Sequence, residues 1–159
     1  MGIKVAKFGG SSVADTIQFM KVKDIILGDS SRRYVVVSAP GKRFDQDTKM
    51  TDLLYLCHTH LLNHLPWDQL LQVVCDRFSA IAFTLGITSD KLDLQGEYNR
   101  IRSAMEDGAG AAYIASRGEY LNGRLMAAYL GWDFIDAADF IKFDGRGRFL
   151  SEETNQALS

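Results

Sequence analysis

The start of the chain combines two short apolar runs with one amphipathic stretch between them. Residues 3–8 (IKVAKF) and 32–37 (RRYVVV) are typical of strands, whereas residues 13–27 carry apolar side chains at helical spacing. Residues 28–31 (GDSS) end that helical pattern. A strand, a helix and a second strand at this spacing predict a βαβ unit and a parallel sheet. The second run is continuously apolar, which predicts a strand buried on both faces.

The helix at 13–27 is expected to bury one face. The apolar side chains that the spacing assigns to this face are Val13, Ile17, Met20, Ile25 and Ile26.

Four longer helical patterns follow a polar segment. They cover residues 51–64, 67–85, 90–107 and 109–130, and the last is expected to be interrupted around Gly118. About three strands against five helices make a narrow sheet, so we expect an α/β fold that is part of a larger domain.

The remainder of the chain predicts one more strand, a hairpin and a helix start. WDFIDAADFI at 132–141 is typical of a buried strand and its exit, with Asp136 capping the next turn. IKFDGRGRFL at 141–150 predicts a hairpin that turns at Asp144-Gly145. Ser151 is the expected N-cap of a final helix.

Composition and charge narrow the class of protein. The 159 residues are 47% hydrophobic and 24% charged, with a net charge of −2, so no overall basic field attracts nucleic acid or an anionic membrane. No apolar run approaches the roughly 18 residues of a membrane span, and the N-terminus lacks the apolar region of a signal peptide. Cys57 and Cys75 lie in apolar helical patterns and are expected to be reduced core thiols in the cytoplasm.

The first strand runs directly into glycines, with a lysine just before them. Backbone N–H groups at Gly9 and Gly10 and the hydroxyl of Ser11 can surround a phosphate, and Lys7 can place a charge on a phosphoryl group in transfer. The alternative is a plain strand–helix turn in which glycine serves only the backbone. The second strand ends in another small-residue turn, 38–41 (SAPG), and both turns should converge at one edge of a parallel sheet.

Neither of two better-known phosphate motifs is present. The sequence contains no G-x-x-x-x-G-K-[ST], and no G-x-G-x-x-G follows the first strand.

Several segments, taken in order, resemble aspartate kinases of the amino acid kinase family. KFGGSSV at 7–13 resembles their N-terminal signature, and VVVSAPGK with TDLL (51–54) resembles their second motif. SRGEYLNGRLMAAYL at 116–130 resembles their third motif, and FIDAADFI resembles the strand that follows it.

The resemblance implies a three-layer αβα sandwich with a mainly parallel sheet and a specific reaction. That reaction is ATP-dependent phosphorylation of the β-carboxylate of L-aspartate, with Mg²⁺, to give 4-phospho-L-aspartate on the route to lysine, threonine and methionine. An aspartate carboxylate has a pKa of about 3.9 and is already ionised at neutral pH, so it needs no general base. Positioning and charge stabilisation then suffice for catalysis.

Site roles also follow from the resemblance. Lys7 would stabilise the transferring phosphoryl group; Gly9, Gly10 and Ser11 would cradle phosphate; Ser38 and Thr51 would line the aspartate pocket; and Glu119 would hold the α-amino group of the substrate. The loop before Thr51 is long, which makes Thr48 a competitor for the role of Thr51.

The family's glycine-rich GRGGSD segment is missing from the sequence, as are its nucleotide-base region and its regulatory ACT domains. Residues 1–159 are therefore expected to be the N-terminal portion of an amino acid kinase catalytic domain. We expect this portion alone to turn over poorly or not at all, and the full-length protein to be a homo-oligomer.

Two other interpretations stay open at this point. One is a different amino acid kinase that acts on another carboxylate, carbamate or phosphate acceptor; the other is a non-catalytic binding module. Among the histidines, His60 and His64 have a spacing compatible with a metal, but no carboxylate or cysteine accompanies them in a recognisable pattern, so no metal site is expected.

Overall fold

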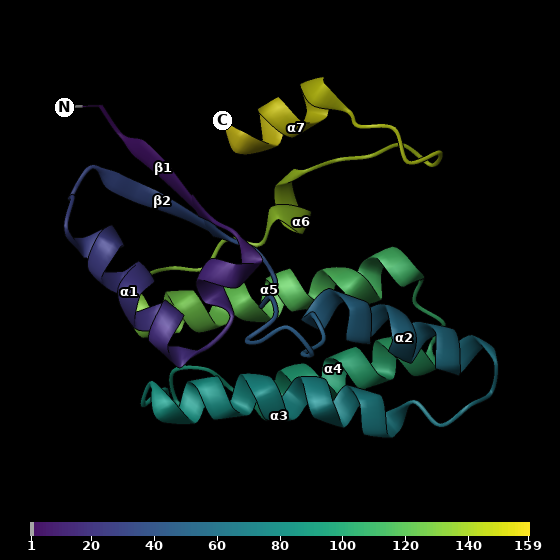
Figure 1. Cartoon of the computed structure of the whole chain (residues 1–159). Coiled ribbons are helices and arrows are strands. Elements are labelled where there is room, and N and C mark those ends of the chain that lie inside the picture. The colour runs from purple at the N-terminus through teal and green to yellow at the C-terminus, as the bar shows by residue number, and fades with distance from the viewer. Residues whose placement is uncertain (1) are drawn as a thin grey trace.

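The computed structural model describes residues 2–159, which form a small sheet beside a layer of helices (Figure 1). The strands are β1 (Lys4–Phe8) and β2 (Arg32–Val37). A short 3₁₀ helix, η1 (Gly10–Val13), follows β1. The α-helices are α1 (Thr16–Leu27), α2 (Met50–Leu62), α3 (Asp68–Thr84), α4 (Leu94–Glu106), α5 (Ala111–Leu130), α6 (Ala137–Phe140) and α7 (Ser151–Leu158).

The strands β1 and β2 pair in parallel and are joined through η1 and α1, which confirms the predicted βαβ unit. Lys7 lies opposite Val36 in the register. The pairing continues one step beyond β2, because the backbone N–H of Ser38 donates to the carbonyl oxygen of Phe8 at 3.0 Å. The expected α/β class with a parallel sheet is thus confirmed.

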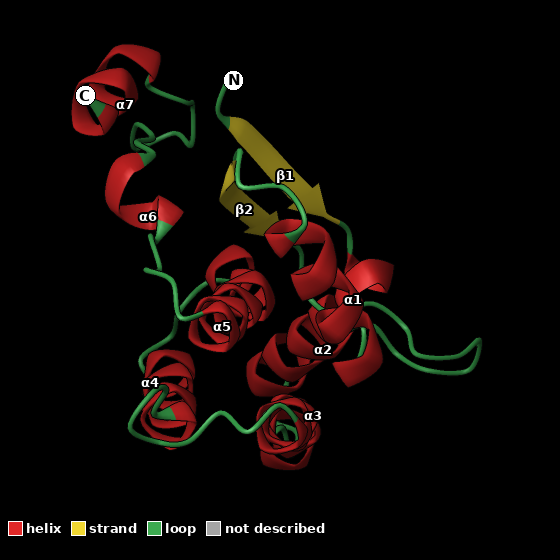
Figure 2. Cartoon of the chain, turned by 90° about the vertical axis from the view of Figure 1, so that its left-hand side faces the viewer, coloured by secondary structure: helices red, strands yellow, loops and turns green. Residues whose placement is uncertain are grey.

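The helical layer covers one face of this sheet. Figure 2 shows α1 to α5 on one side of the strands, while α6 and α7 lie at the level of the strands, away from that layer. The inward side chains that pack against the core are Phe8, Val35 and Val37. The outward side chains Val5, Tyr34 and Val36 are 66%, 54% and 47% exposed. The prediction that the second strand is buried on both faces is therefore wrong for this chain, because within residues 2–159 the helices pack on one face only.

Residues 132–141 do not form the predicted third strand, and the sheet within residues 2–159 has two strands. The segment follows the surface of α5 instead. The N–H of Trp132 donates to the carbonyl oxygen of Ala127, and the ring of Phe134 packs edge-on against Tyr120 at a centroid distance of 5.5 Å. The three-layer sandwich remains a prediction.

The end of the described chain forms the predicted hairpin. Phe143 and Phe149 make an antiparallel bridge, and Gly147 in the turn has a φ of +76°. Asp136 caps α6 by accepting from the N–H of Ala138 at 3.0 Å, as predicted. Ser151 is the first residue of α7 rather than its cap, which is Leu150, so that expectation is wrong.

The buried face of α1 differs from the expected one. Val13 and Ile26 are buried as predicted, but the other inward side chains are Phe19 and Val22. The three residues predicted to be buried but found exposed are Ile17, Met20 and Ile25. The helical phase cannot be counted from Val13, because η1 ends there and α1 begins only at Thr16, where Asp15 accepts from the N–H of Gln18 at 2.9 Å.

The central helix α5 runs without the interruption predicted at Gly118. A Cβ at this position would lie 2.9 Å from the Cβ of Ala39 and 3.4 Å from the Cδ1 of Leu54. Glycine therefore serves close packing of α5 against the turn after β2 and against α2, and the helix stays intact. It ends at Gly131, where φ is +71°.

Cys57 and Cys75 are free and buried, as predicted. Burial raises the pKa of both thiols to about 11, so they are packing groups. None of the helices between residues 2 and 159 combines the length and the apolar character that a membrane span requires.

Candidate functional site

The turns after β1 and β2 meet at the carboxyl edge of the sheet, as the sequence predicted. The N–H of Gly41 donates to the carbonyl oxygen of Gly10 at 2.8 Å. Within the first turn, the N–H of Ser12 donates to the carbonyl oxygen of Gly9 at 2.9 Å. The two turns thus form one continuous backbone surface.

The positions of this surface that hold glycine do so for different physical reasons. A Cβ on Gly10 would lie 2.8 Å from the carbonyl oxygen of Ala39, and a Cβ on Gly41 would lie 2.7 Å from the carbonyl carbon of Gly10. Both glycines are required because two backbones touch. Gly9 has open space around its Cβ position and a φ of −75°, which any residue adopts. Neither packing nor backbone conformation explains glycine at position 9.

Lys7 and Ser11 flank this surface, and both are exposed. Lys7 lies near the end of β1 on the outward face, and it takes part in none of the ion pairs formed within residues 2–159. The helix at the first turn is the short η1, whereas the N-terminus of α1 is capped by the carboxylate of Asp15. An anion at the glycine turn would therefore meet η1 and not the start of α1.

The turn after β2 lies along α5 beside Glu119. Asn122 is fully buried, and its Nδ2 donates to the carbonyl oxygen of Ser38 at 2.7 Å. Gly118 contacts Ala39 from the same helix. Glu119 is exposed and lies between these two contact points on α5, within one helical turn of each. Glu119 therefore belongs to the stretch of α5 that packs against the Ser38 turn.

Thr51 lies in the first turn of α2, which is tied to the same surface. The N–H of Met50 donates to the carbonyl oxygen of Pro40 at 3.3 Å. Thr51 is half-buried, whereas Thr48 is exposed in the preceding loop. The segments that carry Lys7, Ser38, Thr51 and Glu119 therefore converge, and each role remains a prediction.

A buried arginine that sequence analysis did not single out lies behind this surface. Arg77 of α3 is only 6% exposed, and its guanidinium donates to backbone carbonyl oxygens of Ala14, Gly41 and Thr48. A signal was available in the sequence: Arg77 falls between Val74 and Ile81 on the apolar stripe of its helix, where a charged residue needs a buried partner.

The charged partner of Arg77 is Asp47, at 3.2 Å from Nη1 to Oδ2. Asp47 also accepts from Arg43, whose Nε lies 2.7 Å from Oδ2. Hydrogen bonding from Arg43 and the nearby charge of Arg77 hold the pKa of Asp47 well below its usual range. Burial lowers the pKa of Arg77, and the carboxylate of Asp47 opposes this shift.

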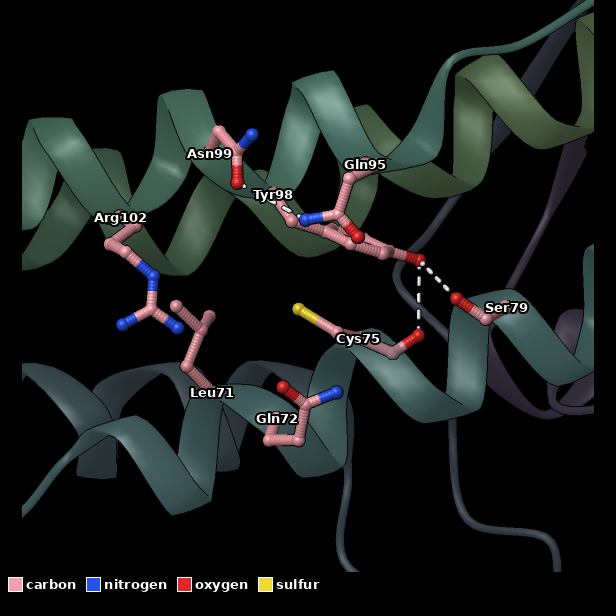
Figure 3. Close-up of a pocket in the computed structure, with 8 residues that line it drawn as sticks. All are labelled: Leu71, Gln72, Cys75, Ser79, Gln95, Tyr98, Asn99 and Arg102. Carbon is pink, nitrogen blue, oxygen red and sulfur yellow. Dashed lines mark hydrogen bonds between the residues drawn. The ribbon is translucent and has the colours of Figure 1, made fainter. Parts of the chain in front are cut away.

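The hollow between α3 and α4 lies apart from these turns. It measures about 80 Å³ and includes Tyr98, whose hydroxyl donates to the carbonyl oxygen of Cys75 at 3.0 Å and lies 3.1 Å from the Ser79 hydroxyl (Figure 3). None of the predicted site residues lines it.

Within residues 2–159, no group of three or more His, Cys, Asp and Glu side chains is arranged to hold a metal ion. The Nδ1 of His60 lies 2.8 Å from the carbonyl oxygen of Pro66.

Comparisons with known proteins agree on one group of enzymes. No family model matches the chain. Aspartokinase 3 of Bacillus subtilis (strain 168) is 32% identical over 164 residues, an alignment that covers 98% of this chain and 35% of the relative.

Solved structures give the same result. The aspartate kinase of Clostridium acetobutylicum, described as an allosteric enzyme, matches 99% of this chain with a TM-score of 0.93 and 44% identity. Escherichia coli aspartokinase III, solved with aspartate and ADP, matches 98% of this chain with a TM-score of 0.79 and 21% identity, which shows the fold alone. Each alignment covers 36% of the solved chain. In sequence and in fold, the chain is therefore similar to aspartate kinases, and it spans about a third of the length of these relatives.

Proposed function

We propose that the full-length protein containing this chain phosphorylates the β-carboxylate of L-aspartate with ATP, giving 4-phospho-L-aspartate and ADP in the cytoplasm. Residues 1–159 are the N-terminal portion of its catalytic domain, which is completed by sequence outside this chain. The observation that most supports this proposal is the backbone contact between Gly10 and Gly41. It joins two small-residue turns beside Lys7 at one edge of the sheet. Relatives named aspartate kinases that match nearly the whole chain support the choice of reaction.

The phosphate side of the proposed site is the turn after β1. Lys7 stabilises the negative charge that develops on the transferring phosphoryl group. Gly9, Gly10 and Ser11 bind phosphate oxygens through backbone N–H groups and a hydroxyl. The open space around Gly9 supports this role, because a side chain there would occupy the place of the ligand.

The aspartate side is built from the turn after β2, α2 and α5. Ser38 and Thr51 line the pocket, and Glu119 pairs with the α-amino group of the substrate. Glu119 is exposed and lies next to the residues that contact the Ser38 turn, which supports a role facing a ligand. The β-carboxylate is ionised at neutral pH and attacks phosphorus without a general base, so the residues need only orient it.

Mg²⁺ enters this proposal with the nucleotide. The proposal assigns this ion to the ATP phosphates, because Mg²⁺ in sites that transfer phosphate is commonly bound through substrate phosphates. The chemistry that it supplies is neutralisation of phosphate charge.

The test is ADP release by the full-length gene product with L-aspartate, L-glutamate or N-acetyl-L-glutamate as acceptor. Lys7→Ala is the decisive variant, and Lys21→Ala on the exposed surface of α1 is its matched control. We expect activity with L-aspartate only, a loss of at least about a hundredfold in Lys7→Ala, and no loss in Lys21→Ala.

Activity confined to another acceptor would assign the protein to a different reaction and remove the role of Glu119. Full activity in Lys7→Ala would contradict the proposed phosphoryl contact. A folded full-length protein with no activity on any acceptor would overturn the proposal and favour a binding module, for which the exposed apolar residues Val5, Tyr34 and Val36 offer a surface.

A further inference from the structure

We propose that Arg77 is a positioning residue for this site. Its buried guanidinium fixes the turn after β1 (the phosphate turn) relative to the turn after β2 (the aspartate turn). This inference rests on the proposed function for its kinetic consequence, whereas its structural part stands without it.

The geometry places one side chain at the junction of three separate segments. Nη2 of Arg77 donates to the carbonyl oxygen of Ala14, after η1, at 3.0 Å, and also to that of Gly41, after β2. Nη1 donates to the carbonyl oxygen of Thr48, in the loop before α2, at 3.2 Å. No element other than α3 reaches all three through one side chain in the described residues.

Each of these segments carries a proposed ligand contact. Ala14 follows the phosphate turn at Gly9 to Ser11, Gly41 belongs to the turn that begins at Ser38, and Thr48 lies three residues before Thr51. Gly41 is also the residue whose N–H binds the carbonyl oxygen of Gly10. A shift of Arg77 therefore moves phosphate-binding and aspartate-binding groups relative to one another.

A guanidinium suits this position better than another side chain does. Its planar fork reaches several acceptors at once in fixed directions, whereas the ammonium of lysine is a single point of charge. Arg77 is held in a largely water-free place, where each carbonyl left without its donor remains desolvated. The carboxylate of Asp47 offsets the cost of burying the charge.

The near-complete burial of Arg77 argues against a direct contact between its side chain and a ligand. Arg77 is 6% exposed, and its Nη atoms already bind the carbonyl oxygens and Asp47. We expect Arg77 to affect the reaction indirectly, by fixing the positions of the turns that contact the ligands.

The test compares Arg77→Lys and Arg77→Met with Arg102→Met in the full-length protein. Arg102 is the matched control, because it also pairs with an aspartate, Asp68, but joins α3 to α4 away from the turns. Arg77→Lys keeps the charge and most of the stem, which protects the test against a failure of Arg77→Met to fold.

The first readout is amide hydrogen exchange, which does not depend on catalysis. We expect faster exchange in residues 9–15 and 38–50 of both Arg77 variants, with unchanged exchange in α4. Arg102→Met should leave exchange in 9–15 and 38–50 unchanged. Unchanged exchange there in both Arg77 variants, or a uniform increase over all elements, overturns the positioning role.

The second readout is the division of the kinetic loss between KM and kcat. Loss of positioning raises KM for ATP and for aspartate and lowers kcat/KM by about tenfold or more in Arg77→Met. A merely structural role would reduce the amount of active enzyme and leave both KM values unchanged, which overturns the inference. If the wild-type protein has no aspartate kinase activity, the proposed function fails, and the exchange result alone decides whether Arg77 holds the turns.

Discussion

The N–H of Gly41 donates to the carbonyl oxygen of Gly10 at 2.8 Å, so the turns that end the two parallel strands touch through their backbones. This contact leaves no space for a side chain on either residue. It makes the edge of the sheet one continuous backbone surface. Packing therefore requires glycine at positions 10 and 41, whereas it leaves room for a side chain at position 9.

Gly41→Ala is expected to lower the free energy of unfolding by about 1–3 kcal/mol, because the new Cβ would lie within 3 Å of backbone atoms of Gly10 and Ser11. Backbone atoms cannot rotate away as a side chain can. Chemical denaturation of the purified protein measures this loss. Gly9→Ala is the matched control and should change stability by less than about 0.5 kcal/mol. Equal stability of the two variants would contradict the packing role of Gly41.

Gly9→Ala is expected to impair the reaction while the fold is retained. Position 9 has open space and an ordinary φ, so a methyl group there disturbs only what binds next to it. We expect kcat/KM for ATP to fall by about tenfold or more in the full-length protein, equivalent to about 1.4 kcal/mol. Wild-type kinetics in this variant would exclude close approach of phosphate to Gly9.

Asn122→Leu is expected to destabilise the protein by about 1–3 kcal/mol, because the fully buried Asn122 side chain would no longer donate to the carbonyl oxygen of Ser38. Asn122→Asp should destabilise it more at neutral pH, since a carboxylate would face that carbonyl in a buried place. The difference between the two variants should shrink in acid, where the new carboxyl group is neutral. Urea unfolding at two pH values checks both statements, and a Leu variant as stable as the wild type would refute the contact.

Acid is expected to weaken the fold in part through Asp47. The arginines around this carboxylate hold its pKa below the unfolded value of about 3.9, so the folded state binds fewer protons. The stabilisation is therefore fully present above about pH 4 and is lost as the pH falls towards the lowered folded pKa.

Urea unfolding between about pH 2 and pH 7 measures this dependence, and Asp47→Asn should flatten it at the acid end. Asp45→Asn, in the same loop but exposed, serves as the control. The same pH dependence in Asp47→Asn and in the wild type would show that the ion pair does not contribute.

Much of the local structure followed from the order of residues. The βαβ unit, the spans of the four long helices and the cap at Asp136 depend on hydrophobic period and turn residues close in sequence, and these were predicted. The convergence of the turns after β1 and β2 also followed, because parallel strands end at one edge of a sheet.

Other features depend on contacts between residues far apart, which no local pattern contains. Gly118 predicts a break by propensity, yet α5 is continuous there, and the close approach of Ala39 explains why the residue is glycine. The run at 132–141 has the composition of a strand, but its backbone follows α5, where the N–H of Trp132 donates to the carbonyl oxygen of Ala127 and Phe134 packs against Tyr120.

The sequence by itself thus determined the residues of the proposed site: a lysine, glycines and hydroxyl groups at strand ends, in an order that resembles aspartate kinases. Only the tertiary structure decided which glycines are held by packing, and that Arg77 and Asn122 support the turns from behind. The physical reason is that a buried polar side chain is explained by its partners, and the partners of Arg77 and Asn122 lie on other elements of the fold.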